Sequence, residues 1–383
     1  MLKKTLCLGF VFMAFVPSCT TQPGQERIPN LAMPFVMALE IYKDGLFVAA
    51  TNYDGKYGSG KLASVTASSG TIRNEYEIYS DSQSVKVFND TLLITSKENN
   101  TLSAINMAGG NINCGNATAK LTDCANASTY KLRHSDPFAL ALLEGNAANT
   151  YVLSAYLSSE KIDLFKISKT PSISFVNSID AKSFITGLDS NYSVSTAQIK
   201  NSNNKIFILL NAHEEKTKEL DRELSLKSYL VEISSADLLL GNRQNAKVRD
   251  LSAFGIKQAN DFYVSNTHLW LLSKNPSGLY KINLSNDFLE NQVSVCSSAK
   301  MMAANETKDI LILPCFEQNI VQSFFMNTLQ VKKLANIKKK SPAYAAIDES
   351  NNLIFVSYFE EHQVGVFDMN LNFLKMLFKK TLN

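Results

Sequence analysis

Short apolar runs broken by polar turns recur along most of the chain. The runs are rich in β-branched and aromatic residues and the breaks in Asn, Asp, Gly and Ser, a pattern typical of β-strands. Long helical periodicity is almost absent. The clearest segment contains four runs in sequence, beginning at Tyr344, Leu353, Val364 and Phe373. It therefore predicts four antiparallel strands joined by short turns.

The second and third of these strands have counterparts throughout the chain. The second-strand runs begin at residues 45, 91, 150, 205, 268, 309 and 353, which makes seven units. A four-stranded unit repeated at roughly 40 to 50 residues has the size of a β-propeller blade. The second run of each unit is apolar on both faces, as expected for a strand packed between neighbouring sheets. We therefore predict an all-β fold, a single domain of seven four-stranded blades spanning residues 31–383.

The last unit, LIFVSYFEEHQVGVFDMN from Leu353, resembles the blades of YVTN or lactonase-like propellers. Their pattern runs from an apolar-aromatic-Val strand through a polar loop to Val-x-Val-Phe-Asp. The resemblance implies seven blades and a ligand site on the face that carries the loops. Both the first and the last unit hold four strands in sequence, which leaves no strand to exchange. Either a register error at one end or closure by side-chain packing would reconcile this with a ring. The rival fold is a pair of β-sandwiches.

The first nineteen residues resemble the signal and lipobox of bacterial lipoproteins. Lys3 and Lys4 precede an uncharged run of about ten residues, and Val16-Pro17-Ser18-Cys19 follows it. At about 1.5 Å per residue the run is too short to cross a membrane, which favours a cleaved signal over residues 1–18. The resemblance implies that Cys19 becomes the lipidated first residue, with palmitate among its acyl chains. Ordinary secretion with an incidental Cys19 is the alternative.

Residues 19–30 are polar and contain Pro and Gly, as expected for a flexible tether between the lipid and the fold. Thr20, and not Asp, follows the cysteine. By analogy with enteric lipoproteins, this favours the outer membrane, on either its periplasmic or its surface side. The formal net charge is only +3, so nothing favours nucleic acid as a partner.

The chain contains six cysteines. Cys7 lies within the predicted signal and Cys19 is the predicted lipidation site, which leaves four. An even number in an exported protein predicts disulfides, and proximity pairs Cys114 with Cys124 and Cys296 with Cys315. No Cys-x-x-Cys spacing or neighbouring histidine pair supports a metal site, so we expect none. Free thiols are the other alternative.

In propellers, the turns between second and third strands lie on one face together with the connections between blades. This analogy gives a location for a binding rim and no activity. The candidate rim residues make that face acidic, with a few aromatic residues; they are Tyr53, Asp54, Tyr57, Glu98, Glu160, Glu214, Lys274, Glu317, Glu360, Glu361 and His362. The simpler interpretation is that turns are polar because water covers them.

Enzyme signatures are scarce. The four histidines are scattered, and no Gly-x-Ser-x-Gly elbow or phosphate loop occurs. No catalytic residue is assigned, and no cofactor or metal is expected. The leading hypothesis is a lipid-anchored envelope protein whose propeller binds or scaffolds a protein or another envelope ligand. The alternative, implied by the lactonase-like resemblance, is a hydrolase or isomerase with its site at the central channel.

Overall fold

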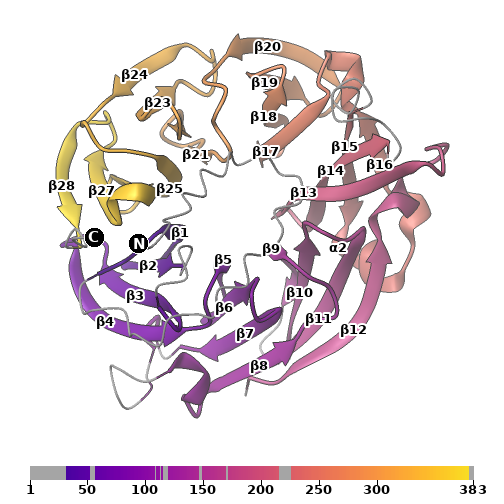
Figure 1. Ribbon diagram of the computed structural model, residues 1–383. Helices are drawn as coiled ribbons and strands as arrows, with labels where there is room; N and C mark the ends of the chain where they lie inside the picture. Colours follow the sequence, from indigo (N-terminus) through magenta and orange to yellow (C-terminus); the bar gives the residue numbers. More distant parts are fainter. Residues whose placement is uncertain are drawn as a thin grey trace, which may run out of the picture.

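Seven antiparallel sheets of four strands each stand around a central opening (Figure 1). The computed structural model describes residues 32–51, 57–107, 109–112, 114, 120–145, 149–169, 171–214 and 226–378. Within these residues the chain forms one sheet after another in sequence order. The predicted seven-bladed propeller is therefore confirmed, and a pair of β-sandwiches is excluded.

Each blade is numbered in chain order, and its strands are lettered A to D from the channel outwards. The strands of blades 1 to 3 are β1 (Val36–Tyr42), β2 (Gly45–Ala50), β3 (Gly60–Thr66), β4 (Thr71–Ile78); β5 (Ser82–Phe88), β6 (Thr91–Ser96), β7 (Thr101–Asn106), β8 (Ala127–Lys131); β9 (Pro137–Gly145), β10 (Asn149–Tyr156), β11 (Lys161–Ser168) and β12 (Ile173–Asp180). Those of blades 4 and 5 are β13 (Tyr192–Ser202), β14 (Lys205–Glu214), β15 (Lys227–Ser234), β16 (Lys247–Asp250); β17 (Gln258–Val264), β18 (His268–Asn275), β19 (Gly278–Asn283) and β20 (Phe288–Ser294). Those of blades 6 and 7 are β21 (Ala303–Asn305), β22 (Ile310–Cys315), β23 (Ile320–Phe324), β24 (Val331–Ala335); β25 (Pro342–Asp348), β26 (Leu353–Tyr358), β27 (Gln363–Asp368) and β28 (Phe373–Leu377).

The helices of the described residues are short and lie in the connections. They are η1 (Leu121–Asp123), η2 (Ala181–Phe184), α2 (Ser235–Leu240), η3 (Arg243–Asn245), η4 (Leu251–Phe254) and η5 (Phe359–Glu361). The bounds of α2 follow from its sequence: the Ser234 hydroxyl accepts a hydrogen bond from the Asp237 N–H, and Gly241 ends the helix with φ of +77°. None of the described helices has the length and apolar character needed to span a membrane.

The predicted second and third strands are confirmed to within a residue at each start. Every residue of the B strands β2, β6 and β22 is buried, as expected where a sheet packs between two neighbours. Two A–B turns also follow directly from the sequence. Asn89-Asp90 and Asn203-Asn204 each place two successive residues at positive φ, the geometry of a type I′ hairpin turn.

The first and last blades close the ring without exchanging a strand (Figure 1). A single apolar cluster crosses this seam, and it includes Leu46 and Val48 from blade 1 and Phe355, Val364 and Val366 from blade 7. All five side chains are almost completely buried. Of the two explanations considered for the missing exchange, closure by side-chain packing is the one observed.

Both disulfides predicted from proximity are present. Cys114 and Cys124 close a loop between the C and D strands of blade 2, with a sequence separation of 10. Cys296 and Cys315 join the connection that enters blade 6 to the end of β22, with a separation of 19.

Candidate functional site

One face of the disc carries the B–C turns and the D–A connections between blades, and we call it the upper face. The A–B and C–D turns form the lower face. Each A strand starts at the upper face and lines the channel as it descends, because D–A connections feed it from above. Residues at the start of an A strand therefore lie near the upper mouth of the channel.

Three predicted rim residues come from the first blade. Tyr53 and Asp54 lie outside the described residues. Tyr57 is on the upper face, but it is buried against Ala32 and offers little surface to a ligand.

Blades 2, 3 and 4 each carry one predicted acidic rim residue, and the surroundings of the three differ. Partial desolvation and the neighbouring charge of Asp81 raise the pKa of Glu98. Glu160 accepts a hydrogen bond from the Val194 backbone N–H at 2.7 Å, and Glu214 accepts one from the Asn191 side chain at 2.6 Å. The last two carboxylates therefore hold the local structure together.

The rim residues of blade 7 are partly structural as well. Glu361 is buried and pairs with Lys339, with 3.5 Å between the Nζ and Oε2 atoms. His362 is buried, and its ring lies 4.5 Å from that of Phe35 between centroids. Glu360 is exposed, as is Glu317 of blade 6.

Three half-exposed phenylalanines form a continuous row across blades 6, 7 and 1, which we call the aromatic ridge. Phe316 and Phe359 each follow directly on a B strand, and Phe35 directly precedes β1. The ring centroids of Phe316 and Phe359 are 6.0 Å apart, and those of Phe359 and Phe35 are 4.9 Å apart. Contacts of this kind contribute about 0.5–1.5 kcal/mol each beyond area burial.

Lysines border the ridge on the side of blade 5. The Lys300 Nζ lies 5.2 Å from the ring centroid of Phe316, within cation–π range. Partial desolvation lowers the pKa of Lys300; the carboxylate of Glu317 opposes this change and the charge of Lys274 reinforces it. Lys257 and Lys274 are exposed on the same face. The upper face is therefore not uniformly acidic, because Lys257 and Lys300, from connections outside the predicted rim, lie on it together with the predicted rim residue Lys274.

The lysine and the ridge are held together covalently. Cys296 and Cys315 join the connection that carries Lys300 to the strand that ends at Phe316. The Glu317 backbone N–H donates a hydrogen bond to the Ser298 hydroxyl at 3.0 Å, which adds a second link. Because these links fix the two segments, the cation and the ring are positioned before any ligand binds.

Two residues of this region adopt a backbone conformation that side chains disfavour. Phe35 has φ of +51° and His362 has φ of +58°. Non-glycine residues in this region cost about 1–3 kcal/mol and persist only where the surrounding structure holds them. Here the ring of Phe35 contacts the tilted ring of Phe359 and the edge-on ring of His362, and these contacts supply that support.

Charged pairs inside the channel join neighbouring blades. Glu40 and Lys86 link blades 1 and 2 at 2.7 Å, and Asp261 and Lys200 link blades 5 and 4 at 2.6 Å. Burial alone would lower the pKa of Lys86, but the carboxylate of Glu40 outweighs this effect and the pKa is raised. Asp261 is fully buried and also accepts the backbone N–H of Met302 at 2.8 Å. In each pair the lysine and the carboxylate compensate each other's charge, so these pairs stabilise the contacts between blades.

Two histidines at the upper face, His213 and His134, each lie close to a polar side chain. The Ser193 hydroxyl lies 2.8 Å from His213 Nε2, and the two residues are directly opposite each other on β13 and β14. His134 Nε2 lies 3.8 Å from the buried carboxylate of Asp163, whose other oxygen accepts the Tyr156 hydroxyl at 2.7 Å. Of these two contacts, the one between Ser193 and His213 joins a possible nucleophile to a possible base.

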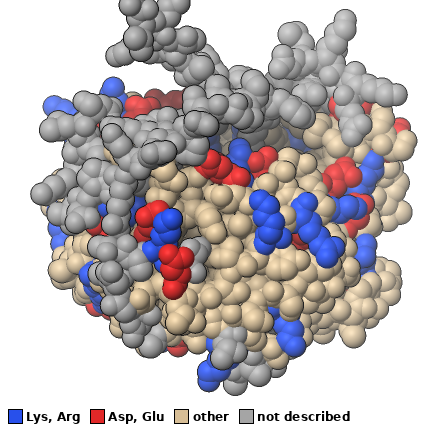
Figure 2. Space-filling view, turned by 60° about the horizontal axis from the view of Figure 1, so that its bottom comes forward, with Lys and Arg blue, Asp and Glu red and all other residues tan. Residues whose placement is uncertain are grey.

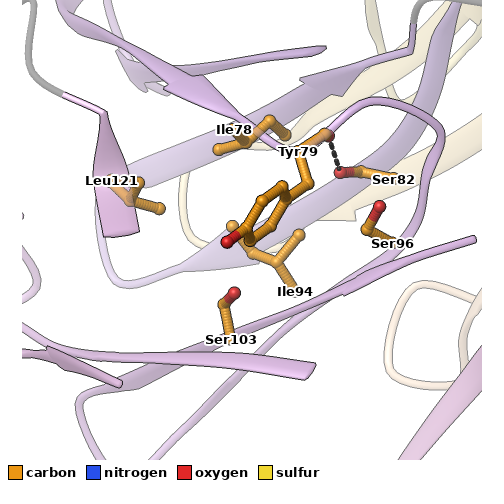
Figure 3. Close-up of a pocket in the computed structure, with 7 residues that line it drawn as sticks. All are labelled: Ile78, Tyr79, Ser82, Ile94, Ser96, Ser103 and Leu121. Atoms are coloured by element: carbon orange, nitrogen blue, oxygen red, sulfur yellow. Dashed lines mark hydrogen bonds between the residues drawn. The ribbon is translucent and has the colours of Figure 1, made fainter. Parts of the chain in front are cut away.

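A cavity lies between blades 1 and 2 (Figure 3). It is small and mostly apolar, and it is lined by Ile78, Tyr79, Ser82, Ile94, Ser96, Ser103 and Leu121. The hydroxyls of Ser82, Ser96 and Ser103 bond to neighbouring protein atoms, and the Tyr79 hydroxyl is the other side-chain polar group of the lining. This cavity is a packing gap between two blades.

On the side of the molecule in Figure 2, basic and acidic side chains lie beside one another on a largely uncharged background. Within the described ranges, no group of three His, Cys, Asp or Glu side chains is arranged to hold a metal ion. The ridge and its lysines are therefore the strongest candidate site.

The predicted rim does not include the phenylalanines of the ridge, although the sequence contains one signal for them. Phe-Glu follows the B strand in both blade 6 and blade 7, as Phe316-Glu317 and Phe359-Glu360. Only the glutamates of these repeated pairs were taken as rim residues. Phe35 carries no such signal, because only the closed ring brings it to Phe359.

No protein-family profile matches the chain, and no curated protein matches it in sequence. Two solved structures share its fold at a TM-score of 0.55. One is a functionally unknown protein from Desulfotomaculum acetoxidans DSM 771, with 11% identity over 83% of this chain and 92% of that chain. The other is the dihydro-heme d1 dehydrogenase NirN in complex with DHE, with 12% identity over 94% of this chain and 78% of that chain. At this identity the likeness extends to the propeller fold alone.

Proposed function

We propose that this chain is a lipid-anchored envelope protein whose propeller binds a protein partner through the aromatic ridge. Cys19 would hold the disc at the membrane, and the ridge would engage the partner. The main support for this binding surface is the row of Phe35, Phe359 and Phe316, with Lys300 positioned beside it.

The chemistry of the ridge favours an acidic segment with apolar side chains. Half-exposed aromatic rings gain free energy when an apolar group covers them, and aromatic residues are enriched in protein interfaces. Partial desolvation and the charge of Lys274 lower the pKa of Lys300, and a partner's carboxylate would stabilise the charged form of this lysine. The disulfide between Cys296 and Cys315 reduces the ordering cost of such binding.

Site-specific photocrosslinking in cells tests this proposal. A benzoylphenylalanine placed at residue 316 or 359 is expected to give one discrete adduct with an envelope protein. The same probe at Val176, an exposed position on the outer strand of blade 3, serves as the control and is expected to give none. An identical adduct from all three positions, or none from 316 and 359, would contradict the proposal.

Charge reversal provides a second, matched test. Lys274→Glu with Lys300→Glu is expected to reduce the adduct at residue 359 at least about tenfold, because like charges then face an acidic partner. Lys308→Glu changes an exposed lysine in an A–B turn, on the lower face, and is expected to have no effect. Equal loss in both variants would show that overall charge, and not the ridge, controls the contact.

Hydrolysis is the second candidate function, and the Ser193–His213 pair is the observation that favours it. A serine hydroxyl within 2.8 Å of a histidine nitrogen, near the mouth of the channel, has the geometry of a nucleophile with its base. A fluorophosphonate probe should label the protein if this is correct, and Ser193→Ala should abolish the labelling while Ser195→Ala leaves it intact. Absence of labelling in the unmodified protein, together with no turnover of lactone or ester substrates, would reject this function.

A further inference from the structure

The outer strands of blades 5, 6 and 7 each begin with an exposed apolar residue. Phe288, Val331 and Phe373 are the first residues of β20, β24 and β28, and they are 62%, 51% and 44% exposed. They pair with residues at the end of their C strands: Asn283 and Phe324 are the last residues of β19 and β23, and Phe367 is the last but one of β27. All three therefore occupy the same corner of the disc, at the lower face and the outer edge.

Two further apolar side chains extend this surface. Phe325 precedes the C–D turn of blade 6 and Leu374 follows Phe373, with exposures of 37% and 52%. The corresponding first outer-strand residues in blades 1 to 4 include no exposed large apolar side chain. We call the surface made by Phe288, Phe325, Val331, Phe373, Leu374 and the lysines 332, 333 and 375 the corner patch.

Hydrogen bonds between blades make the corner patch continuous. The Asn291 side chain donates to the Thr328 carbonyl at 2.6 Å, which holds the outer strand of blade 5 against the turn of blade 6. Lys332 donates to the Met369 carbonyl at 3.5 Å and in the same way joins blade 6 to blade 7. An arc of three adjoining blades therefore carries the exposed apolar groups.

The lysines of the corner patch make no direct contact with a carboxylate among the described residues, although the charge of Lys333 acts on the nearby carboxylate of Asp368. Lys332 lies over the ring of Phe325 at 5.4 Å, and the side chain of Lys333 bonds the neutral side chain of Asn372. Among the described residues, none of the lysines 332, 333 and 375 forms an ion pair, whereas Lys247 on the outer strand of blade 4 is paired with Asp287. Positive charge without a direct carboxylate contact, beside exposed apolar groups, is the character of a surface that binds anionic membranes.

Three of the carboxylates near the corner patch are already engaged. Asp287, which directly precedes Phe288, pairs with Lys247 and Arg249. Asp368 accepts hydrogen bonds from the backbone N–H groups of Asn370 and Asn372. Glu290, two residues along β20 from Phe288, accepts from Asn283 and pairs with Lys281 at 3.1 Å. Their local partners reduce the repulsion that they exert on an anionic surface.

We propose that the corner patch rests on a membrane that contains anionic phospholipids. The inference builds on the lipid anchor of the proposed function, which brings the disc to a membrane, and adds how the disc lies on it. The thirteen residues from Cys19 to Leu31 can reach at most about 45 Å. A seven-residue strand such as β1 spans only about 23 Å. The tether is therefore long enough for the lower corner to meet the same membrane, and the aromatic ridge then faces away from it.

Vesicle cosedimentation tests this inference on the chain from Thr20 to Asn383, which keeps every described residue and carries no acyl chain. We expect binding to vesicles of phosphatidylglycerol and phosphatidylethanolamine, and weak binding to phosphatidylcholine alone. Raising the NaCl concentration to about 0.5 M should weaken the binding, since salt screens the lysines. Absence of binding to anionic vesicles would overturn the inference and leave both the lipidation of Cys19 and the partner contact at the ridge untouched.

The decisive variant combines Phe288→Ser, Val331→Ser and Phe373→Ser. It is expected to reduce vesicle binding at least about tenfold with an unchanged melting temperature, because the three side chains are exposed. The matched control, Phe316→Ser with Phe359→Ser on the upper face, should bind vesicles like the unmodified chain. Equal binding by the corner variant would refute the inference. So would a dimer of the unmodified chain that the corner substitutions dissociate, since the patch would then be covered by a second copy.

Discussion

Lys375, in the last strand of the ring, donates a hydrogen bond from its ammonium group to the backbone carbonyl of Ser69 in the first blade. The two residues are 306 positions apart in the chain. Gly70 follows at φ of +72°, and a Cβ atom there would lie 2.7 Å from the Lys375 Nζ. Only glycine therefore allows the last strand to approach this turn so closely.

The same type of contact recurs at other seams of the ring. Asn106 donates to the Lys169 carbonyl between blades 2 and 3, and Trp270 donates to the Met326 carbonyl between blades 5 and 6. In each case a side chain from one blade satisfies a carbonyl in the C–D turn of the next. The closing seam is thus built like the others, which explains how a ring without strand exchange remains closed.

The first prediction concerns the apolar core of that seam. Phe355→Ala should destabilise the protein by about 3–5 kcal/mol, because Phe355 is fully buried between blades 7 and 1. The fluorescence of Trp270, the one tryptophan, reports urea unfolding from the opposite part of the ring. Phe165→Ala, which empties a similar position between blades 2 and 3, is the matched control. A much smaller effect for Phe355→Ala would indicate that the seam is open in solution.

The second prediction concerns the disulfide beside the ridge. Replacing Cys296 and Cys315 with alanine should cost about 3 kcal/mol, since the bond restricts a loop of about 20 residues in the unfolded chain. Crosslinking from residue 316 should weaken as well, because Lys300 and Phe316 lose their covalent link. Replacing Cys114 and Cys124 should cost a similar free energy and leave the crosslink unchanged. Thiol titration of the unfolded, unreduced protein checks that all four cysteines are oxidised.

The architecture could be predicted from sequence because its signal is local. Each B strand is an unbroken apolar run, and seven such runs at blade spacing define the fold before any contact is known. The candidate site could not be predicted in the same way. Phe35 and Phe359 are separated by most of the chain and meet only when the ring closes, and Lys300 reaches Phe316 through a connection that has no repeat signature.

The third prediction concerns acid stability. The hydrogen bond from Asn283, together with Lys281 and His268, lowers the pKa of Glu290 to about 2 from its usual value of 4.5. A lowered pKa stabilises the folded state above pH 4.5, and this contribution is lost as the pH falls from 4.5 toward 2. Glu290→Gln should therefore cost about 1 kcal/mol at pH 7, reduced because the group is partly solvated.

Melting temperatures measured from pH 7 to pH 3 check this sign. The difference between Glu290→Gln and the unmodified protein should shrink below pH 4.5. Glu317→Gln, an exposed glutamate on the upper face, is the control and should show a small difference at every pH. A difference for Glu290→Gln that grows on acidification would contradict the assignment.

The fourth prediction concerns the lipid anchor, which depends on Cys19, outside the described residues. Cells fed an alkyne analogue of palmitate should label the unmodified protein, whereas Cys19→Ala should remove the label and yield a soluble form. Cys7→Ser is the matched control, because Cys7 lies within the predicted signal and should be lost with it. Several acyl chains, at about 0.8 kcal/mol per buried CH₂, hold a soluble domain on a membrane far more firmly than the corner patch alone. Unchanged labelling and membrane partitioning of Cys19→Ala would therefore show that the chain is not a lipoprotein anchored at this cysteine.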